Sequence, residues 1–417
     1  MGGSRALDPR AALADRFYYG WVVAVACLLA ATAVFGLTYS FGVFFERMLA
    51  AFAASRARLS LVFGVQTFVL YVGATASGGL VDRYGPRRML LVGTGLLVGG
   101  LLATSRSRSF LALLAAYGLV TALGLSIVYV VAYASVPRWF GRRRGAAQGL
   151  ATAGLGLGLV AIPPAADALI RSVGWRNAFV ALAAGVGAVC LVVSLLFADD
   201  PVDVGADPSV EFPDGRADGS DSDPRGAATT ALRRPSFLLV LLGWVFVYTT
   251  LYAVMSHLVL HVTDVGLPQQ VGVTAIAVIG VTTSVARIGL GVLSDRVGRV
   301  RIFVVCSTLM GLSMAALAVA QSPLAVFAVV AAYGVGYGGN GALLSPLVAD
   351  LFGNENLSTL YGILSVAFAV SGLAAPPVAG AVFERAGGYA PIFLAFGALG
   401  VVGAGCVGVA GRLATRE

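Results

Sequence analysis

Residues 271–301 read VGVTAIAVIGVTTSVARIGLGVLSDRVGRVR, and the architecture of the whole chain can be inferred from this stretch and its counterparts. Its apolar part is long enough to cross a bilayer, it contains one arginine, Arg287, and it ends in a basic turn at 295–301. An arginine in mid-membrane costs about 2.5–3.5 kcal/mol on insertion scales, so it normally faces a bundle interior or a water-filled cavity and has a partner there. No acidic side chain precedes the turn to be that partner. We therefore expect the missing anion to be a substrate.

The composition is that of a membrane protein. Of the 417 residues, 58% are hydrophobic and 12% are charged, far more apolar than a soluble domain. The formal charge of +8 does not indicate nucleic acid, because the arginines lie in short turns between apolar spans and form no continuous basic face. The 4 cysteines are scattered through apolar runs without disulfide or metal spacing. We therefore expect no metal, no cofactor and no nucleic-acid partner.

Twelve apolar spans divide six and six around a polar segment. Nine of the 20 acidic residues lie between Asp199 and Asp223 among Gly, Pro, Ser and Ala, which indicates a solvated linker. The sequence predicts an all-α membrane protein with two pseudo-symmetric six-helix bundles. Its expected parts are an N-terminal segment, 1–17, a first bundle, 18–198, an acidic linker, 199–235, a second bundle, 236–410, and a tail, 411–417.

The distribution of arginine predicts the orientation. With both termini on one side, 19 arginines fall on that side and 8 on the other, with Arg287 inside the membrane. The positive-inside rule makes the richer side cytoplasmic. We therefore expect a multi-pass protein of the cell (cytoplasmic) membrane with both termini and the linker in the cytoplasm.

The two halves are internal repeats. The pattern Gly-x-x-x-Asp-Arg-x-Gly-x-x-Arg at 78–88 recurs 213 positions later at 291–301, and the same offset relates 149–174 to 362–387, each with a Pro-Pro pair. An even number of spans in each half makes these parallel repeats, an arrangement that places two bundles around a central site. Arg287 corresponds to Ala74 under this offset. Because it is present in one half only, Arg287 is a better candidate for a site than for scaffold.

The repeated turns place carboxylates and guanidiniums at helix ends on the side of the termini. Such groups can form salt bridges between helices that hold one conformation and release in another, which suggests a gate. The alternative is charge that only sets the topology. The gate residues that we expect are Asp82, Arg83, Arg88, Asp295, Arg296 and Arg301.

Several polar residues within the spans are candidates for substrate binding. Arg287 presents a planar fork of donors that matches a carboxylate, although it lies two turns before Asp295 and could instead extend to the membrane interface. His257 can hydrogen-bond a substrate or relay a proton, or it can be a packed polar residue. The remaining candidates, each with a structural alternative, are Tyr129, Tyr133, Tyr39 and Asn340.

The duplicated turn on a six-plus-six chain resembles the major facilitator superfamily over nearly the whole sequence. Within it, Tyr19-Gly20-Trp21, the segment 138–149 and HLVLHVTDVG at 257–266 are similar to the monocarboxylate transporters and their bacterial lactate and oxalate–formate relatives. The resemblance implies that the eighth-span Arg287 binds a carboxylate and that His257 and Tyr129 line the site.

The chain departs from that family in two places. Thr283 stands where animal monocarboxylate transporters have an aspartate, and the first-span lysine of those proteins has no counterpart in a chain without lysine. The oxalate-type antiporter uses a lysine in its eleventh span, and this chain has no basic residue between Tyr361 and Phe383. One buried cation favours a monoanion over a dianion.

We therefore expect a secondary transporter that moves a small monocarboxylate, such as lactate or pyruvate, by alternating access with proton symport. Its partners would be the bilayer, a small organic anion and protons. The alternative is an anion antiporter of the oxalate–formate type. Another alternative is an efflux carrier for a lipophilic compound, which would be expected to place an acid in the cavity if its substrate were cationic, and no acid lies in mid-membrane. An enzyme is not expected because no nucleophile–base pair or metal cluster is present. A non-transporting receptor would bind its ligand without accumulating it in sealed vesicles.

Overall fold

The computed structural model describes residues 18–140, 143–204, 231–353 and 357–414. The expected N-terminal segment, residues 205–230 of the expected linker and residues 415–417 of the expected tail lie outside this range.

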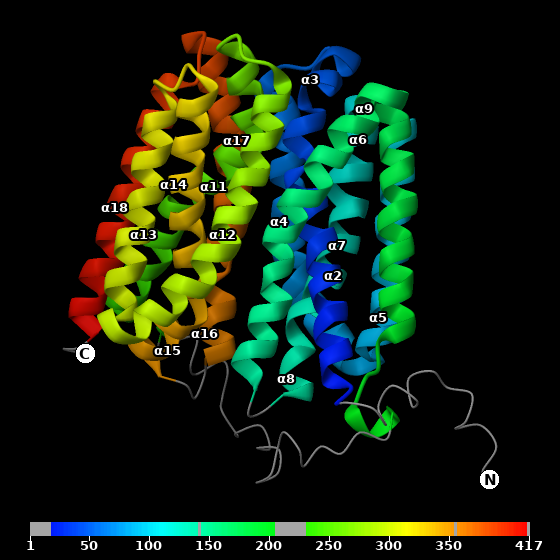
Figure 1. Ribbon diagram of the computed structural model, residues 1–417, viewed down its shortest axis with the longest axis vertical. Helices are drawn as coiled ribbons and strands as arrows, with labels where there is room; N and C mark the ends of the chain where they lie inside the picture. Colours follow the sequence, from blue (N-terminus) through cyan, green and yellow to red (C-terminus); the bar gives the residue numbers. More distant parts are fainter. Residues whose placement is uncertain (1–17, 141–142, 205–230, 354–356, 415–417) are drawn as a thin grey trace.

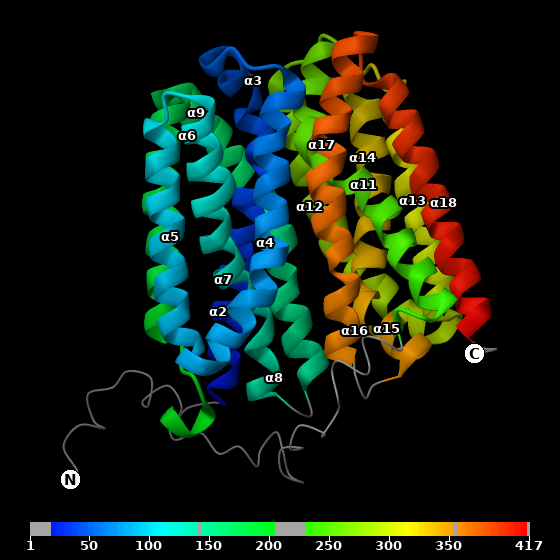
Figure 2. The same ribbon diagram turned by 180° about the vertical axis from the view of Figure 1, so that it is seen from behind.

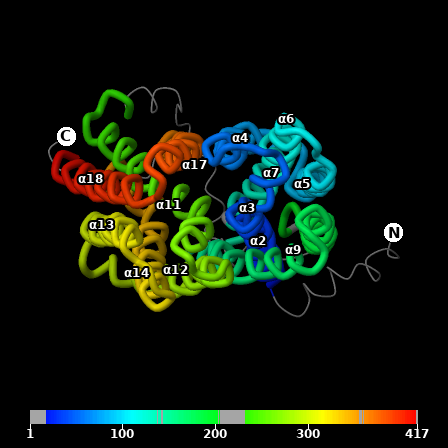
Figure 3. Tube along the Cα trace, turned by 90° about the horizontal axis from the view of Figure 1, so that it is seen from above, coloured from blue at the N-terminus to red at the C-terminus, as the bar shows by residue number. Residues whose placement is uncertain are grey.

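Each half of the chain forms one bundle of helices, and the two bundles stand side by side (Figures 1, 2 and 3). The first contains α2 (Gly20–Tyr39), α3 (Phe41–Phe52), α4 (Arg56–Tyr84), α5 (Pro86–Arg106), α6 (Phe110–Leu113), the π-helical η2 (Leu114–Thr121), α7 (Ala122–Ala134), α8 (Val136–Trp139) and α9 (Arg144–Leu196), followed by the 3-10 turn η3 (Pro201–Val204). The second contains α11 (Pro235–Asp264), α12 (Gln269–Val297), α13 (Arg299–Leu317), α14 (Pro323–Ala342), α15 (Leu344–Phe352), α16 (Leu357–Leu364), α17 (Val366–Ala386) and α18 (Ala390–Ala414).

Eleven helices of the described chain are long and apolar enough to cross a membrane. The longest, α9, has 53 residues, but Gly174 inside it has a φ of 79° and a ψ of 159°, outside the helical region. Because glycine adopts a positive φ without steric cost, the helix breaks there and α9 comprises two crossings. The crossings then number twelve, as the hydrophobic pattern predicts.

The internal repeat is visible in the backbone as well. Gly85 and Gly298, which precede α5 and α13, have φ values of 85° and 103°, and Gly174 and Gly387 have φ values of 79° and 71°. The members of each pair are 213 residues apart. The sequence therefore repeats glycine where each half turns with a positive φ.

The two bundles pack closely at one end. We call the lower edge of Figure 1, where α2 begins and α18 ends, the termini side, and the opposite edge the far side. Toward the far side α4 packs along α17 and α9 packs along α12. A Cβ added at Gly156 would lie 2.7 Å from the Gly280 carbonyl oxygen, and one added at Gly64 would lie 2.8 Å from that of Leu373. Only residues without a side chain allow helices to approach this closely.

The same helices separate toward the termini side. Gly149 lies two turns before Gly156 on the same face of α9, and Gly78 lies four turns after Gly64 on the same face of α4. Apart from the backbone of its own helix, no described atom lies within 4 Å of a Cβ added at Gly149 or Gly78. The interface between the halves is therefore closed on the far side and open on the termini side.

Candidate functional site

Arg287 lies at the interface of the two bundles. It is half-buried on α12, about 15 Å from the end of that helix at Val297 by helical rise. Its guanidinium carbon lies 5.8 Å from the centroid of the Tyr337 ring, and a Cβ added at Gly341 would lie 2.8 Å from Nη2. The arginine therefore packs against α14 instead of extending to the end of its own helix.

Arg287 has no anionic partner in the part of the chain that the structure describes. None of the ion pairs there includes it, and its Nε is buried without a hydrogen-bond partner. Leaving a buried polar donor unpaired costs about 1–3 kcal/mol, and more when the donor is charged. A bound anion would remove this cost, because it would supply the missing acceptor.

Several phenols lie near the guanidinium. Tyr133 of the first half and Tyr248, Tyr337 and Tyr361 of the second half lie within electrostatic range of Arg287. Arg287, Tyr133 and Tyr361 are each half-buried although they interact across the interface. We conclude that their remaining exposed surface borders the open part of the interface.

Two predicted site residues, Tyr129 and Tyr39, belong to the same aromatic cluster. The Tyr129 ring lies 4.9 Å from that of Tyr133 and 5.8 Å from that of Tyr71 on α4. Tyr39 is buried with its ring 5.9 Å from Phe35, and its hydroxyl has no hydrogen-bond partner. The structure thus brings Tyr129 and Tyr39 to the phenols that surround the arginine.

Asn340, another predicted site residue, is buried inside the second bundle. Its Oδ1 accepts a hydrogen bond from the Tyr248 hydroxyl at 2.9 Å. Its Nδ2 donates to Ser307 Oγ at 3.3 Å and to Met310 Sδ at 3.1 Å. Both ends of the amide are therefore engaged, and Asn340 connects to the site only through Tyr248.

The structure does not bring His257 to Arg287. His257 is fully buried, with Nδ1 at 2.8 Å from the Tyr389 hydroxyl and Nε2 at 2.9 Å from the Pro376 carbonyl oxygen and 3.2 Å from Ser60 Oγ. His257 lies 7 residues from the far-side end of α11, whereas Arg287 lies 18 residues from the far-side start of α12. Helical rise therefore separates the two side chains by roughly 15 Å.

His257 belongs instead to a polar network that joins the halves on the far side. Arg56, the first residue of α4, donates to both carboxylate oxygens of Asp264, at 2.5 and 2.8 Å, and to the Tyr389 hydroxyl at 2.9 Å. The Arg56 guanidinium carbon also lies 3.7 Å from the centroid of the Phe383 ring. We call Arg56, Asp264, Tyr389 and His257 the far-side latch.

The hydrogen bonds in the latch fix the tautomer of a neutral His257. The Pro376 carbonyl can only accept, so Nε2 carries a proton and donates to it. Burial raises the pKa of the Tyr389 hydroxyl above its usual value, so this group keeps its proton. With a neutral imidazole, Nδ1 therefore accepts from the Tyr389 hydroxyl, whose oxygen also accepts from Arg56.

The repeated turns on the termini side form ion pairs within each half. Asp82 accepts from Arg138 of α8 at 2.5 Å, and Arg299 binds Asp350 of α15 at 2.6 Å and Asp295 at 3.4 Å. These pairs link helices, as expected of the turns, but none of them crosses between the bundles. The other expected gate residues are exposed and form no ion pair with a described residue; they are Arg83, Arg88, Arg296 and Arg301.

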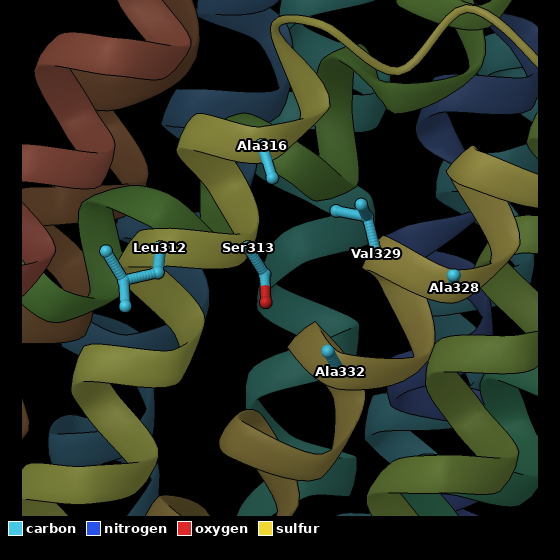
Figure 4. Close-up of a pocket in the computed structure, with 6 residues that line it drawn as sticks. All are labelled: Leu312, Ser313, Ala316, Ala328, Val329 and Ala332. Atoms are coloured by element: carbon cyan, nitrogen blue, oxygen red, sulfur yellow. The ribbon is translucent and has the colours of Figure 1, made fainter.

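Two cavities lie away from the interface. One of about 320 Å³ lies between α13 and α14, and Figure 4 shows its lining, in which Ser313 is the polar side chain. The other, of about 480 Å³, lies between α12 and α14. Neither lining includes an ionisable residue, so neither cavity is a candidate for binding an anion.

The comparisons with known proteins agree with this architecture. Residues 26–291 and 273–413 match the family described as Major Facilitator Superfamily. The chain belongs to this superfamily. It is 28% identical over 393 residues to "Monocarboxylate transporter 13" of Bos taurus, covering 93% of this chain and 88% of that protein. It is 26% identical over 377 residues to "MFS transporter asaE" of Aspergillus flavus, covering 88% and 81%.

A solved structure has the same fold. It is that of a bacterial homolog of the human lysosomal transporter Spinster, in an inward-facing and unoccupied conformation. The TM-score is 0.73 with 16% sequence identity, covering 95% of this chain and 98% of that one. Membership in the major facilitator superfamily confirms the predicted fold class, and the relatives confirm the predicted similarity to monocarboxylate transporters. The family is one of multi-pass transporters and not of enzymes.

The sequence does not single out every residue near Arg287 or in the latch. Tyr133 is among the candidates that it predicts, one turn after Tyr129 on the same helix face. Arg56 and Asp264 carry opposite charges at helix ends on the same side, which is a weaker signal because many such pairs are possible. Tyr337 and Tyr361 gave no signal that distinguishes them from tyrosines inside a bundle.

Proposed function

We propose that this transporter carries a monocarboxylate across the cell membrane and that Arg287 binds the carboxylate. The observation that supports this most strongly is the unpaired, half-buried guanidinium at the open interface. An arginine fork matches a carboxylate with two parallel hydrogen bonds. The similarity to monocarboxylate transporters favours the same class of substrate.

The phenols around Arg287 would complete the site. Tyr133, Tyr337 and Tyr361 can donate hydrogen bonds to a carboxylate or to a 2-oxo or 2-hydroxy oxygen, as in pyruvate and lactate, without contributing charge. The single cation favours a monoanion. Tyr129 and Tyr39 would then form the wall of the site, and Asn340 would hold Tyr248 in place.

Alternating access would exchange the open and closed ends of the interface. The positive-inside count favours a cytoplasmic termini side. In that orientation the latch closes the outer end, and His257 acts there instead of contacting substrate. Opening the outer end requires Arg56 to leave Asp264, while the repeated turns approach each other on the inside. The residues that would meet there are Asp82, Arg83, Arg88, Asp295, Arg296 and Arg301.

We favour proton symport as the coupling mode. Moving a proton with the anion keeps the transported pair neutral, which lowers the cost of crossing an apolar interface. His257 is the titratable group of the latch whose neutral form can accept a proton. The second candidate is anion exchange of the oxalate–formate type. It is favoured by the absence, in the described chain, of a carboxylate paired with Arg287 that could carry the proton.

Uptake into proteoliposomes tests this function and separates the two modes. For symport we expect labelled lactate or a larger 2-hydroxy acid to accumulate with time, faster under an inward proton gradient and without an internal anion. Exchange predicts that uptake needs internal formate or lactate and does not respond to the gradient. If no carboxylate accumulates in either condition, the protein does not carry this class of substrate.

A further inference from the structure

We propose that the site prefers an aromatic monocarboxylate, an arylalkanoate with a polar group on its ring, over lactate and pyruvate. The inference rests on the proposed function, because it extends the Arg287 site to the rest of the substrate. Three observations carry it: a row of aromatic rings, their exposure, and two hydroxyls without partners.

The row of rings joins the two halves at the level of the site. Tyr129 lies 4.9 Å from Tyr133 and 5.8 Å from Tyr71. Across the interface the Tyr71 ring lies 5.2 Å from Phe368 of α17, which in turn lies 4.5 Å from Tyr248. Tyr133 and Tyr248, the two ends of this row, both lie within electrostatic range of the Arg287 guanidinium. A substrate held by the guanidinium is therefore next to aromatic rings from both halves.

Several of these rings keep exposed surface. Tyr71, Tyr129 and Tyr133 are half-buried, although each packs against another ring. Aromatic rings attract a further ring in edge-to-face or offset geometry. A three-carbon acid has no group that reaches them and would leave their apolar surface in water. An aryl group would cover that surface and displace the water.

Two buried hydroxyls lie deeper in the interface without partners. Tyr252 lies close to Tyr71, and Tyr39 lies close to Tyr337, but neither hydroxyl meets hydrogen-bond geometry. Tyr252 is 17 residues from the termini-side start of α11, whereas Arg287 is 10 residues from the termini-side end of α12. Helical rise thus places Tyr252 about 10 Å further toward the far side.

This depth matches a substrate with polar groups at both ends. When the carboxylate meets Arg287 and the ring points toward the far side, the ring substituent approaches the unpartnered hydroxyls. A site with buried polar groups of this kind discriminates against analogues that cannot pair with them. A hydroxyl or similar group on the ring, distal to the carboxylate, is therefore the expected substituent.

A matched series of 2-hydroxy acids tests the inference with the full-length chain in proteoliposomes. The acids are lactate, 3-phenyllactate, 3-cyclohexyllactate and 3-(4-hydroxyphenyl)lactate, and the measurement is the half-saturating concentration for uptake of each. We expect a value at least tenfold lower for 3-phenyllactate than for lactate. The cyclohexyl acid should fall between them, and the ring hydroxyl should lower the value a further two- to fivefold.

Two variants separate substrate recognition from packing. Tyr129→Leu removes a ring, and Tyr129→Phe keeps it. We expect Tyr129→Leu to reduce the ratio between the lactate and 3-phenyllactate values at least fivefold, whereas Tyr129→Phe keeps that ratio within twofold of wild type. Equal loss for both acids in Tyr129→Leu would show that the ring only packs the interface, and would overturn the inference.

The outcomes also distinguish this inference from the proposed function. If lactate uptake depends on Arg287 but aryl acids are not preferred, the inference fails and the carboxylate function stands. If none of the four acids is taken up, both fail.

Discussion

A guanidinium surrounded by phenols differs chemically from one beside a carboxylate. Phenols donate and accept hydrogen bonds but leave the positive charge of Arg287 uncompensated. A substrate anion would therefore bind there without displacing an internal ion pair. Because Arg287 is half-buried at the open part of the interface, water can reach it, and under the proposed function a substrate would take the same route.

The hydroxyl of Tyr133 is the clearest single group to remove. If it hydrogen-bonds the bound acid, Tyr133→Phe loses a bond worth about 0.5–1.5 kcal/mol, which corresponds to a roughly two- to tenfold higher half-saturating concentration. Transport assays in proteoliposomes measure this value. Tyr84→Phe, at an exposed tyrosine, is the matched control and should behave as wild type. An unchanged value in Tyr133→Phe would remove this hydroxyl from the site.

The residues of the site differ in how far the sequence predicts them. Arg287 is conspicuous because a charge in an apolar span is costly. Its phenols are not, because the chain has 14 tyrosines and the rotation of each helix about its axis determines which of them face the interface. His257 shows what the sequence does not predict, because its contacts with Tyr389 and Pro376 depend on the packing of segments far apart in the chain.

Among the structural elements, the latch is a polar link between α4 and the second half. Arg56 and Asp264 are 208 residues apart, so no local pattern predicts that they pair. Both are partly shielded, with 18% and 29% of their side chains exposed, and the pair is bidentate. This geometry makes the pair stronger than an ordinary surface salt bridge.

Breaking the latch should open the far side. We expect Arg56→Gln, Asp264→Asn and the double variant to expose the far-side interface to similar degrees, because all three lose the same interaction. Labelling of Thr67→Cys by a membrane-impermeant maleimide measures this, in a background without the 4 native cysteines. Thr67 is buried against Gly372 of the other half in the closed state.

A control for the latch lies on the opposite side of the molecule. Asp350→Asn breaks an ion pair that stays within the second half, so it should leave the labelling of Thr67→Cys unchanged. If labelling in the double variant equals the sum of the increases in the single variants, Arg56 and Asp264 act independently and do not form a latch.

For the molecule as a whole, the sequence predicts the fold better than the site. Span lengths, the 213-residue repeat and the arginine distribution suffice for twelve helices in two parallel halves. Gly174 and Gly387 show why the repeat is readable, since each occupies a positive φ that other residues adopt with strain. The sequence does not predict the end at which the halves meet, because under alternating access the same helix faces must pack in both the inward-open and the outward-open conformation.

Two glycines on one face of α9 test whether the open and closed ends of the interface change places during transport. A leucine at position 156 would meet the Gly280 carbonyl and should prevent closure of the far side, whereas a leucine at 149 has open space in the described conformation. We expect Gly156→Leu to increase maleimide labelling of Thr67→Cys. Gly149→Leu should leave labelling low and reduce uptake at least tenfold, because the termini side can no longer close. Wild-type uptake in Gly149→Leu would show that α9 and α12 do not approach there.

The interface between the halves matters for transport only if the substrate binds there, and Arg287 is the residue proposed to bind it. We would therefore measure carboxylate uptake by proteoliposomes containing Arg287→Gln, with Arg106→Gln, at an exposed arginine in the last turn of α5, as the matched control. We expect uptake in Arg287→Gln to fall at least a hundredfold while the folded, inserted protein is recovered in normal amounts, and Arg106→Gln to transport as wild type. Equal uptake by Arg287→Gln and Arg106→Gln would contradict the assignment of Arg287 as the residue that binds the carboxylate.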